Sequence, residues 1–152
     1  MAIDAGAIGT ELPIVESTME ARRLRFFAKA IGETDPVYSD LEAARAAGHP
    51  DLPVPPTFLF GIELERPEPF GFLTDLGVDL RRILHGTQSF VYHSTAHAGD
   101  TLIARPRIAD VYAKKGGALE FVVKETAVAA VDGSPIADLS TVIVVRSPEA
   151  TA

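Results

Sequence analysis

Residues 32–40 form a loop with several groups that could move protons. Glu33 and Asp35 are carboxylates and Tyr38 follows them, so a general base with a neighbouring polar group would be available here. The same residues also suit structural roles: Asp35 before a proline is typical of a turn, Asp40 of a helix cap, and Glu33 of a solvated side chain. Taken alone, the residues favour these structural roles.

Histidine is another residue type that could act as a base or a metal ligand, and the chain has four: His49, His85, His93 and His97. A spacing of four would place His93 and His97 together on a helix. On a strand, which we predict there, they lie about 13 Å apart at roughly 3.3 Å per residue. One ion cannot bridge that distance, so we predict no metal site. His85-Gly86 and Gly99-Asp100 are interpreted first as turns.

Two basic pairs, Arg81-Arg82 and Lys114-Lys115, could contact phosphate groups, which attract clustered cations. A solvated hairpin tip is the alternative interpretation, and the residues alone favour it. The chain has no G-x-G-x-x-G, P-loop, nucleophile-elbow or H-E-x-x-H motif, so nucleotide chemistry and hydrolytic triads have no support. It has no cysteine, which excludes thiol catalysis, cysteine-ligated zinc and iron–sulfur clusters.

The composition predicts one globular domain, residues 1–152, with a sizeable core, since 47% of the residues are hydrophobic and 23% are charged. A net charge of −7 argues against broad binding to nucleic acid or anionic membranes. The N-terminus does not resemble a signal peptide, and apolar runs such as 142–145 are far shorter than the about 20 residues of a spanning helix. We expect a soluble, cytoplasmic protein with residues 147–152 as a frayed tail.

A helix is predicted over roughly 19–31, opened by a capping box between Ser17 and Glu20 and ended by Gly32. Its apolar residues follow helical spacing, and its cations are expected in solvent. The apolar residues are Leu24, Phe27, Ala28 and Ile31, and the cations are Arg22, Arg25 and Lys29. A second capping box, residues 39–42, predicts a short helix that Gly48 ends.

Pro56 is predicted to open a helix that continues to about Leu64, because proline is favoured at the first helical position. This segment is apolar on nearly every side, which indicates a helix of about ten residues, some 15 Å long, buried all round. Pro67 and Pro69 end it. A loop or distorted turn over residues 70–80 leads to the second half of the chain.

The second half alternates between apolar and polar residues, which is typical of strands. The predicted strands begin at about His85 and cover 101–112, 119–131 and 137–145, with turns at 99–100, 114–117 and 132–133. They predict a long antiparallel meander. With the buried helix, this indicates an α+β fold in which a curved antiparallel sheet wraps around one hydrophobic helix.

Several motifs in the same order resemble the MaoC-like dehydratases, over roughly residues 10–146. The quoted segments are 32–40 (Gly-Glu-Thr-Asp-Pro-Val-Tyr-Ser-Asp), 43–48, 55–58, 84–90, 98–102 and 110–117. The resemblance implies a hot-dog fold and a place among (R)-specific enoyl-CoA hydratases and (3R)-hydroxyacyl-ACP dehydratases, which use no cofactor. It also implies that two hot-dog units pair side by side, with an acyl-thioester tunnel at their junction.

The family motif Gly-Asp-x-Asn-Pro-(Leu/Ile/Val)-His carries an Asp and a His that hold the reacting water. In this chain Glu33 stands at the Asp position and Tyr38 at the His position. Glutamate is one methylene longer than aspartate. A phenol, whose unperturbed pKa is about 10, replaces imidazole poorly at neutral pH. The chain therefore resembles the N-terminal, FAS1-like units and the substrate-holding subunits of heterodimeric (3R)-hydroxyacyl-ACP dehydratases, whose partner chain does the chemistry.

The resemblance implies an acyl tunnel lined by residues of the buried helix and the segment after it: Thr57, Phe58, Phe60, Ile62, Phe70 and Phe72. Arg81, Arg82, Lys114 and Lys115 would contact the phosphates of CoA or acyl carrier protein. Two alternatives stay open: a self-sufficient homodimeric hydratase or thioesterase using Glu33 or Asp35, and a non-enzymatic acyl-thioester binding protein. Acyl chain length and the identity of the carrier are not determined by the residues.

Overall fold

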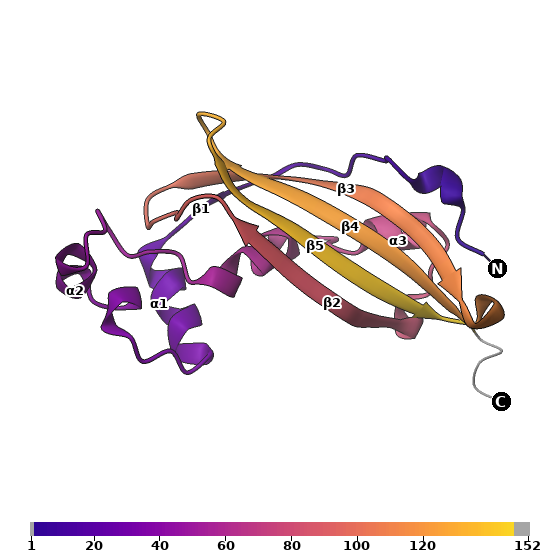
Figure 1. The fold of residues 1–152 in the computed structure, drawn as a ribbon, viewed down its shortest axis with the longest axis horizontal. Helices are drawn as coiled ribbons and strands as arrows, with labels where there is room; N and C mark the ends of the chain where they lie inside the picture. Colours follow the sequence, from indigo (N-terminus) through magenta and orange to yellow (C-terminus); the bar gives the residue numbers. More distant parts are fainter. Residues whose placement is uncertain (1, 148–152) are drawn as a thin grey trace.

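The computed structural model describes residues 2–147, and a five-stranded antiparallel sheet in the order β1-β3-β4-β5-β2 dominates it (Figure 1). The strands are β1 Val15–Thr18, β2 Ile83–Tyr92, β3 Thr101–Lys114, β4 Leu119–Ala130 and β5 Pro135–Arg146. The α-helices are α1 Ala21–Ala30, α2 Leu41–Ala46 and α3 Gly71–Asp75. Short 3₁₀ helices are η1 Ala5–Ala7, η2 Pro36–Tyr38, η4 Leu80–Arg82 and η5 Lys115–Gly117, and a longer one is η3 Pro56–Glu65.

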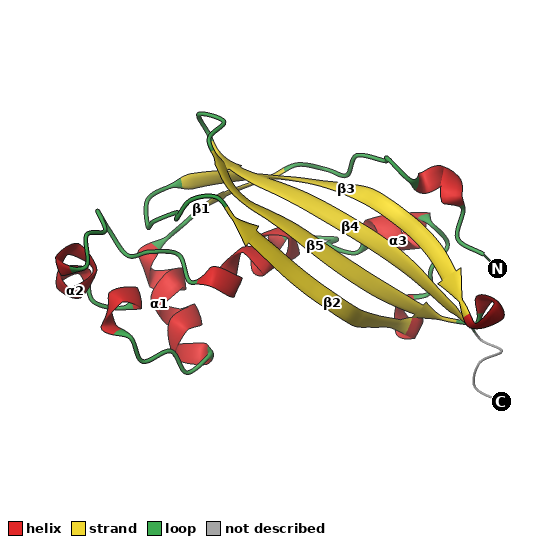
Figure 2. Cartoon of the chain, in the orientation of Figure 1, coloured by secondary structure: helices red, strands yellow, loops and turns green. Residues whose placement is uncertain are grey.

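The curved sheet covers η3 and α3 on one face, while α1 and α2 gather at the left end of the molecule (Figure 2). The inner face is apolar because inward residues alternate with outward ones along each strand, as in the burial pattern of β5. The predicted α+β hot-dog architecture is confirmed: one sheet wraps around one hydrophobic helix.

The buried apolar side chains form two clusters beneath the sheet. The first joins α1, η3 and the Leu102, Val128 and Leu139 region of the sheet, and the second joins α3 to the opposite end. Members of the second cluster include Leu73, Val78, Ile108, Val122, Ile143 and Val145. The inward positions 124 and 126 of β4, between Val122 and Val128, are Lys and Thr, so a polar row separates the two clusters.

The meander prediction is correct for β3, β4 and β5 but wrong for β2. β2 pairs with β5 at the far edge, not with β3, which follows it in the chain. The connection after β2 is held by the segment before η3: the Val54 N–H donates to the Ala96 carbonyl and the Ala98 N–H to the Leu52 carbonyl, both at 2.8 Å. Local turn signals could not reveal this long-range pairing. The predicted turns at 114–117 and 132–133 are confirmed.

Both predicted capping boxes are wrong in detail. Ser17 lies in β1, so α1 begins at Ala21 after Glu20, whose side chain makes no capping hydrogen bond. In α2 the cap is Asp40 rather than Ser39, because the Asp40 carboxylate accepts from the Ala43 N–H. The predicted end of α1 is correct: helix α1 stops at Ala30, and Gly32 takes a left-handed φ of 72° that favours glycine.

The central helix exists where proline predicted it, but it is a 3₁₀ helix. At about 2.0 Å per residue, ten residues span about 20 Å rather than 15 Å. It is not buried all round: Phe58, Leu59, Ile62 and Glu63 face the core, while Thr57 and Leu64 are exposed. The expected loop at 70–80 contains the short helix α3.

The two edges of the sheet differ. On the β1 side, residues 9–12 extend the coverage of β3 through hydrogen bonds to residues 106 and 108. On the other side β2 offers ten residues with most side chains at least partly exposed, and nothing in residues 2–147 pairs with its outer edge. Exposed edge strands are ready templates for pairing with another chain.

Position 86 of β2 requires glycine because neighbouring atoms of β5 lie too close for a Cβ atom, and not because of its φ angle. A Cβ at this position would lie 2.9 Å from the Val142 carbonyl oxygen and 2.9 Å from a Val144 methyl group. The register of β2 with β5 shifts here, between His85 and Thr87, which produces a bulge. His85-Gly86 is therefore part of a strand, not the turn that the dipeptide suggested.

Residues 148–152 of the expected tail lie outside the described residues; the Ser147 N–H donates to the Ala118 carbonyl. Within residues 2–147, no helix has the length and apolar character needed to cross a membrane.

Candidate functional site

The carboxylates of the acid–base loop are engaged by the loop itself. Glu33 Oε1 accepts hydrogen bonds from the N–H groups of Thr34 and Asp35, each at 2.9 Å. Asp35 Oδ1 accepts from the Val37 N–H at 3.0 Å and caps η2. Both side chains are exposed. In this chain they brace the turn that carries Tyr38, and they do not line the cavity beside it.

Tyr38 lines a cavity of about 170 Å³ between η2, the start of η3 and the end of β2. The polar members of its lining are Tyr38, His49, Tyr92, Ser94 and Thr95, and the remainder is apolar, including Pro53, Pro56 and Leu59. Burial raises the pKa of Tyr92 to about 12, and the nearby Tyr38 adds to this effect. The Tyr92 phenol therefore stays protonated near neutral pH and acts as a hydrogen-bonding group rather than a base.

His49 brings an imidazole to this cavity, which the sequence patterns did not predict. His49 Nδ1 and His97 Nε2 lie 2.9 Å apart, so one nitrogen donates and the other accepts. Burial lowers the pKa of His97, and the neighbouring His49 lowers it further. The two histidines meet because residues 53 and 97 form an isolated antiparallel bridge, and no local spacing signals that contact.

The two histidines spaced four residues apart, His93 and His97, contact different side chains. His93 Nε2 lies 2.7 Å from Asp138 Oδ2, whereas His97 contacts His49. Within the described part of the chain, no three His, Asp or Glu side chains converge on a site that could hold a metal ion.

The residues predicted to line an acyl tunnel occupy two environments. Phe58 and Ile62 are buried in the first core cluster, and Phe58 packs edge-on against Phe27 at 5.3 Å. Phe60 is half-buried and stacks on His85 of β2, with the ring centroids 5.3 Å apart. Thr57 is exposed at the start of the same helix.

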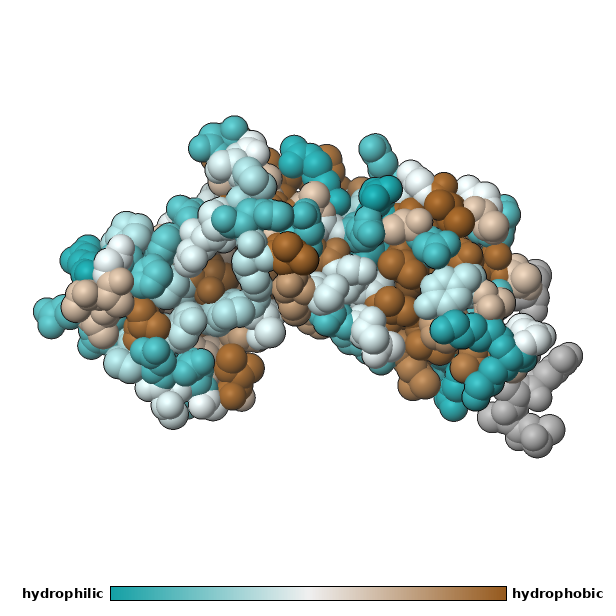
Figure 3. All heavy atoms as spheres, in the orientation of Figure 1, coloured by the Kyte–Doolittle hydropathy of each residue, from teal (hydrophilic) through white to brown (hydrophobic). Residues whose placement is uncertain are grey.

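The other two predicted aromatic residues lie beyond η3. Phe70 is exposed, and Phe72 is half-buried against the second cluster. Along β2 and the segments near it, several large apolar side chains are more than a third exposed: Leu64, Phe70, Leu80, Leu84, Val91 and Tyr92. On the face in Figure 3, brown hydrophobic residues gather over the strand half of the molecule.

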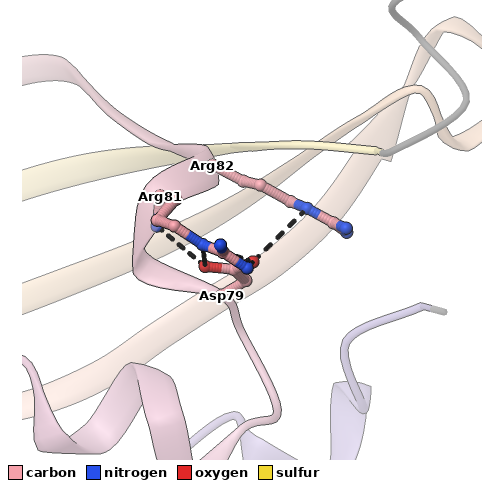
Figure 4. A network of polar contacts seen from close by, with 3 residues as sticks. All are labelled: Asp79, Arg81 and Arg82. Carbon is pink, nitrogen blue, oxygen red and sulfur yellow. Dashed lines mark hydrogen bonds and ion pairs between the residues drawn. The ribbon is translucent and has the colours of Figure 1, made fainter.

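The Arg81-Arg82 pair is tied to Asp79 (Figure 4). Arg81 Nη2 lies 2.7 Å from Asp79 Oδ2, and Arg82 Nε lies 3.9 Å from the same oxygen. Hydrogen bonds from Arg81 lower the pKa of Asp79 to about 2. One acidic side chain therefore partly offsets two of the cations predicted to contact phosphates.

The Lys114-Lys115 pair lies at the β3–β4 hairpin. Lys114 Nζ sits about 5.5 Å above the Tyr112 ring and 5.4 Å above the Phe121 ring. This hairpin and the Arg81-Arg82 pair lie at the same end of the sheet, because residue 119 pairs with 146 and residue 83 with 145. That end is separated from the Tyr38 cavity by the nine steps of β2, about 30 Å.

A buried ion pair in the core was also missed by the sequence patterns. Glu63 Oε2 lies 2.5 Å from Lys124 Nζ, and Glu63 Oε1 accepts from Thr126 Oγ1 at 2.6 Å. Lys124 Nζ also lies 5.7 Å from the Phe72 ring centroid. The available signal was a charged residue, Glu63, within the otherwise apolar residues 58–64. This network fixes η3 to β4 midway along the sheet.

A larger hollow of about 720 Å³ lies elsewhere, near residues 11–14 and the strand residues 105–107, 125–127 and 138–140. It contains none of the residues singled out as catalytic, tunnel-lining or phosphate-binding. The smaller cavity contains one of the residues singled out as catalytic, Tyr38.

Comparison with known families gives one match over most of the chain. The model of the "FAS1-like, dehydratase domain region" matches residues 6–139. A UPF0336 protein of Saccharopolyspora erythraea is 33% identical over 147 residues, covering 96% of this chain and 93% of that protein. A UPF0336 protein of Clavibacter michiganensis is 35% identical over 143 residues, covering 93% and 95%.

Solved structures agree on the fold. The truncated HadBC (3R-hydroxyacyl-ACP dehydratase) complex of Mycobacterium tuberculosis matches with a TM-score of 0.71 and 27% identity, covering 87% of this chain and 94% of that chain. The ChsH1-ChsH2 complex of the same organism matches with a TM-score of 0.72 and 22% identity, covering 95% and 92%. A MaoC-like dehydratase matches with a TM-score of 0.82 and 18% identity, covering 94% of this chain and 43% of that longer chain.

The last two similarities, below 25% identity, establish the fold alone, whereas the family model and the sequence relatives span nearly the whole chain. The chain therefore belongs to the FAS1-like dehydratase domain family, as a UPF0336 protein with the MaoC-like hot-dog fold.

Proposed function

We propose that this chain is the acyl-holding unit of a (3R)-hydroxyacyl-thioester dehydratase or (R)-specific enoyl-CoA hydratase, and that a second hot-dog chain supplies the catalytic Asp and His. The observation that carries the proposal is the Tyr38 cavity. Its wall has a phenol where the family motif has imidazole, and no carboxylate from the preceding loop lines it. The cavity can accommodate a small part of a substrate but lacks the family's proton-transfer pair.

The chemistry explains why a second chain is needed. Hydration of an enoyl thioester requires one group to accept a proton from water and another to deliver a proton to the α-carbon, both at contact distance. Glu33 and Asp35 already accept backbone hydrogen bonds within their loop. The partner's intact motif would supply the missing groups, and this chain would supply apolar surface.

The open β2 edge supports such pairing. It combines an unpaired strand with exposed apolar side chains at Leu84, Val91 and Tyr92. Two hot-dog units joined along this edge would bury those side chains and leave no exposed strand edge between them. HadBC and ChsH1-ChsH2, which share this fold, are described as complexes of two named chains.

Side-by-side pairing would also explain why the predicted cations lie far from the cavity of the same chain. A two-fold relation between paired edge strands makes them antiparallel, so the Ile83 end of one strand lies beside the far end of the other. The Arg81-Arg82 end of this chain would then approach the partner's active centre. Cations some 30 Å from this chain's own cavity would thus serve the cavity in which the partner does chemistry.

The test measures hydration of crotonyl-CoA by the purified chain, by a hot-dog partner carrying the intact Asp/His motif, and by the two together. We expect negligible turnover by this chain alone and restored turnover in the pair. Replacing the partner's Asp or His should abolish turnover, while Glu33→Gln in this chain should leave it nearly unchanged. Robust turnover by this chain alone, lost in Glu33→Gln, would overturn the proposal.

The same assay separates the remaining alternatives. A thioesterase would release free thiol without consuming the enoyl double bond. A non-enzymatic binding protein would bind acyl thioester but show no turnover with any hot-dog partner.

A further inference from the structure

Three polar side chains lie next to one another on the inner face of the sheet, which is otherwise largely apolar. Lys124 of β4 pairs with Thr141 of β5, and Thr141 pairs with Gln88 of β2, so the three occupy adjacent strands. They share this face with Val122 and Ile143 of the second core cluster, because residues two apart in a strand point the same way. Polar residues at inward positions are the informative exceptions in an apolar core.

Ion pairs and hydrogen bonds hold these side chains in place. Lys124 Nζ lies 2.5 Å from Glu63 of η3, and the two side chains are only 13% and 11% exposed. Nearer the edge, Thr141 Oγ1 donates to Gln88 Oε1 at 2.6 Å. Glu63, Lys124, Thr141 and Gln88 together form a transverse row that leads from η3 to the edge strand. Because neighbouring strands lie about 4.8 Å apart, the row extends about 10 Å across the sheet.

The transverse row lies close to the residues predicted to line the acyl tunnel. Phe60 of η3 stacks on His85 of β2. His85 pairs with Ile143, which is two residues from Thr141 in β5, so the row crosses β5 about 7 Å farther along the sheet. The proposed function places the partner's active centre beside the start of β2. An acyl tail would therefore enter near Phe60 and run along the inner side of β2 toward the row.

We propose that the transverse row stops the acyl tail and restricts the substrate to short-chain enoyl and 3-hydroxyacyl thioesters. This inference rests on the proposed function and deepens it by naming the substrate class. A longer tail would have to lie against the Glu63–Lys124 ion pair, where its methylene groups find no apolar partner. Moving the pair aside would leave buried charges and hydrogen-bonding atoms without partners, which is costly.

The surroundings of the transverse row separate this role from a purely structural one. Apolar clusters lie on both sides of the row, so apolar side chains in its place would make the inner face continuously apolar. The row itself, and not a shortage of apolar surface, therefore sets the limit on tail length. If the ion pair only positioned η3, its removal would affect thioesters of every chain length equally.

The test compares kcat/KM of the assembled pair for crotonyl-CoA and octenoyl-CoA. One methylene in an apolar pocket changes kcat/KM by about 10- to 200-fold, so we expect the native pair to prefer crotonyl-CoA by about tenfold or more. Glu63→Leu/Lys124→Met and Thr141→Val/Gln88→Leu each remove part of the row and should raise the octenoyl-to-crotonyl ratio by about tenfold or more. Ser17→Ala, at a buried polar position of β1 outside the row, should leave the ratio unchanged. Circular dichroism verifies folding of each variant.

A binding measurement separates this inference from the proposed function. Calorimetry compares saturated butyryl-CoA and octanoyl-CoA; octanoyl-CoA should bind the native pair no more tightly than butyryl-CoA, and more tightly once the row is removed. Equal hydration of both enoyl thioesters by the native pair, or an unchanged ratio in both folded variants, would refute the tail stop. A pair that hydrates neither thioester would contradict the proposed function instead. Calorimetry, with this chain alone if no pair assembles, would then decide the tail stop, and an unchanged binding ratio would refute it.

Discussion

At the scale of single residues, two side chains of the loop, Glu33 and Tyr38, differ from the family motif. The loop scaffold is present, since Pro36 follows an N-capping Asp35 and Tyr38 reaches the cavity wall. The Glu33 carboxylate, however, bonds to the backbone of its own loop. The departure lies in side-chain chemistry and not in backbone shape, so it should be reversible by substitution.

The first prediction is that restoring the motif restores activity. The triple variant Glu33→Asp/Asp35→Asn/Tyr38→His rebuilds the family sequence on the existing loop. General acid–base catalysis contributes about 10²- to 10⁴-fold, so we expect crotonyl-CoA hydration at least about 10²-fold above the unmodified chain. Spectrophotometric loss of the enoyl absorbance measures it, with Tyr38→Phe as an inactive control. A folded triple variant with no gain would contradict the assignment of this cavity.

The second prediction concerns His97, which rests against His49. Its pKa is lowered in the folded protein, mainly by burial. The unfolded chain therefore takes up a proton that the folded chain resists, and stability falls as the pH drops through the usual histidine range below about 6.5. Nearby acids, Asp51 and Asp100, oppose the shift but do not cancel it.

We expect His97→Gln to flatten this dependence. Urea denaturation at pH 7.5 and pH 5.5 gives the free energy of unfolding of both proteins. The loss on acidification should be smaller in the variant, even if the variant is less stable at both pH values. An equal loss in both proteins would show that the histidine pair does not contribute to the acid sensitivity.

At the scale of elements, the contact between η3 and β4 depends on a buried ion pair. Glu63 and Lys124 have side chains only 11% and 13% exposed, and Thr126 satisfies the second carboxylate oxygen. Burying two charges costs desolvation energy that their attraction roughly offsets, so the pair specifies position more than it adds stability. The pair fixes the position of η3 along the sheet, which apolar contacts alone specify less strictly.

The third prediction follows from that balance. Glu63→Leu leaves the Lys124 ammonium buried without its partner and should destabilise the fold by about 3–5 kcal/mol. The double variant Glu63→Leu/Lys124→Met removes both charges and should recover most of that loss. Chemical denaturation of the four proteins of this cycle measures the coupling between them. Additive effects, with no recovery in the double variant, would contradict a buried, coupled pair.

At the scale of the whole molecule, the two edges of the sheet differ in how far they are covered. Residues 9–12 extend the coverage beside β1, while β2 leaves a ten-residue edge with Leu84 and Val91 exposed by 50% and 58%. The helix η3 lies next to that edge, since Phe60 of η3 stacks on His85 of β2. Both features support the proposal that a second hot-dog unit joins at this surface.

The fourth prediction is that charges on this edge block assembly but not folding. Leu84→Lys/Val91→Lys places two cations on the edge strand, a device by which natural edges avoid pairing. We expect association with the hot-dog partner to weaken at least tenfold, with little change in Tm. Sedimentation velocity measures association, and Ile8→Lys/Val131→Lys, at exposed sites away from β2, is the control. Unchanged association would place the junction elsewhere.

Local sequence determined those features that depend on neighbouring residues. Alternation identified most of β3, β4 and β5, helical spacing identified α1 with its exposed cations, and the proline at position 56 marked the start of the central helix. The motif around residues 32–38 indicated the family and revealed its altered dyad. Each of these signals comes from backbone geometry or side-chain periodicity within a few residues.

Only the tertiary structure decided what distant segments do together. It placed β2 at the edge beside β5, joined His49 to His97, and buried Glu63 against Lys124, which is 61 positions away. It also separated the Tyr38 cavity from the Arg81-Arg82 end by the length of β2. Such contacts arise from how the whole sheet closes over η3, and the free energy that selects them is spread over the entire core. No short segment carries that information. The sequence motifs therefore indicated the family, whereas the surfaces and long-range contacts could be described only from the tertiary structure.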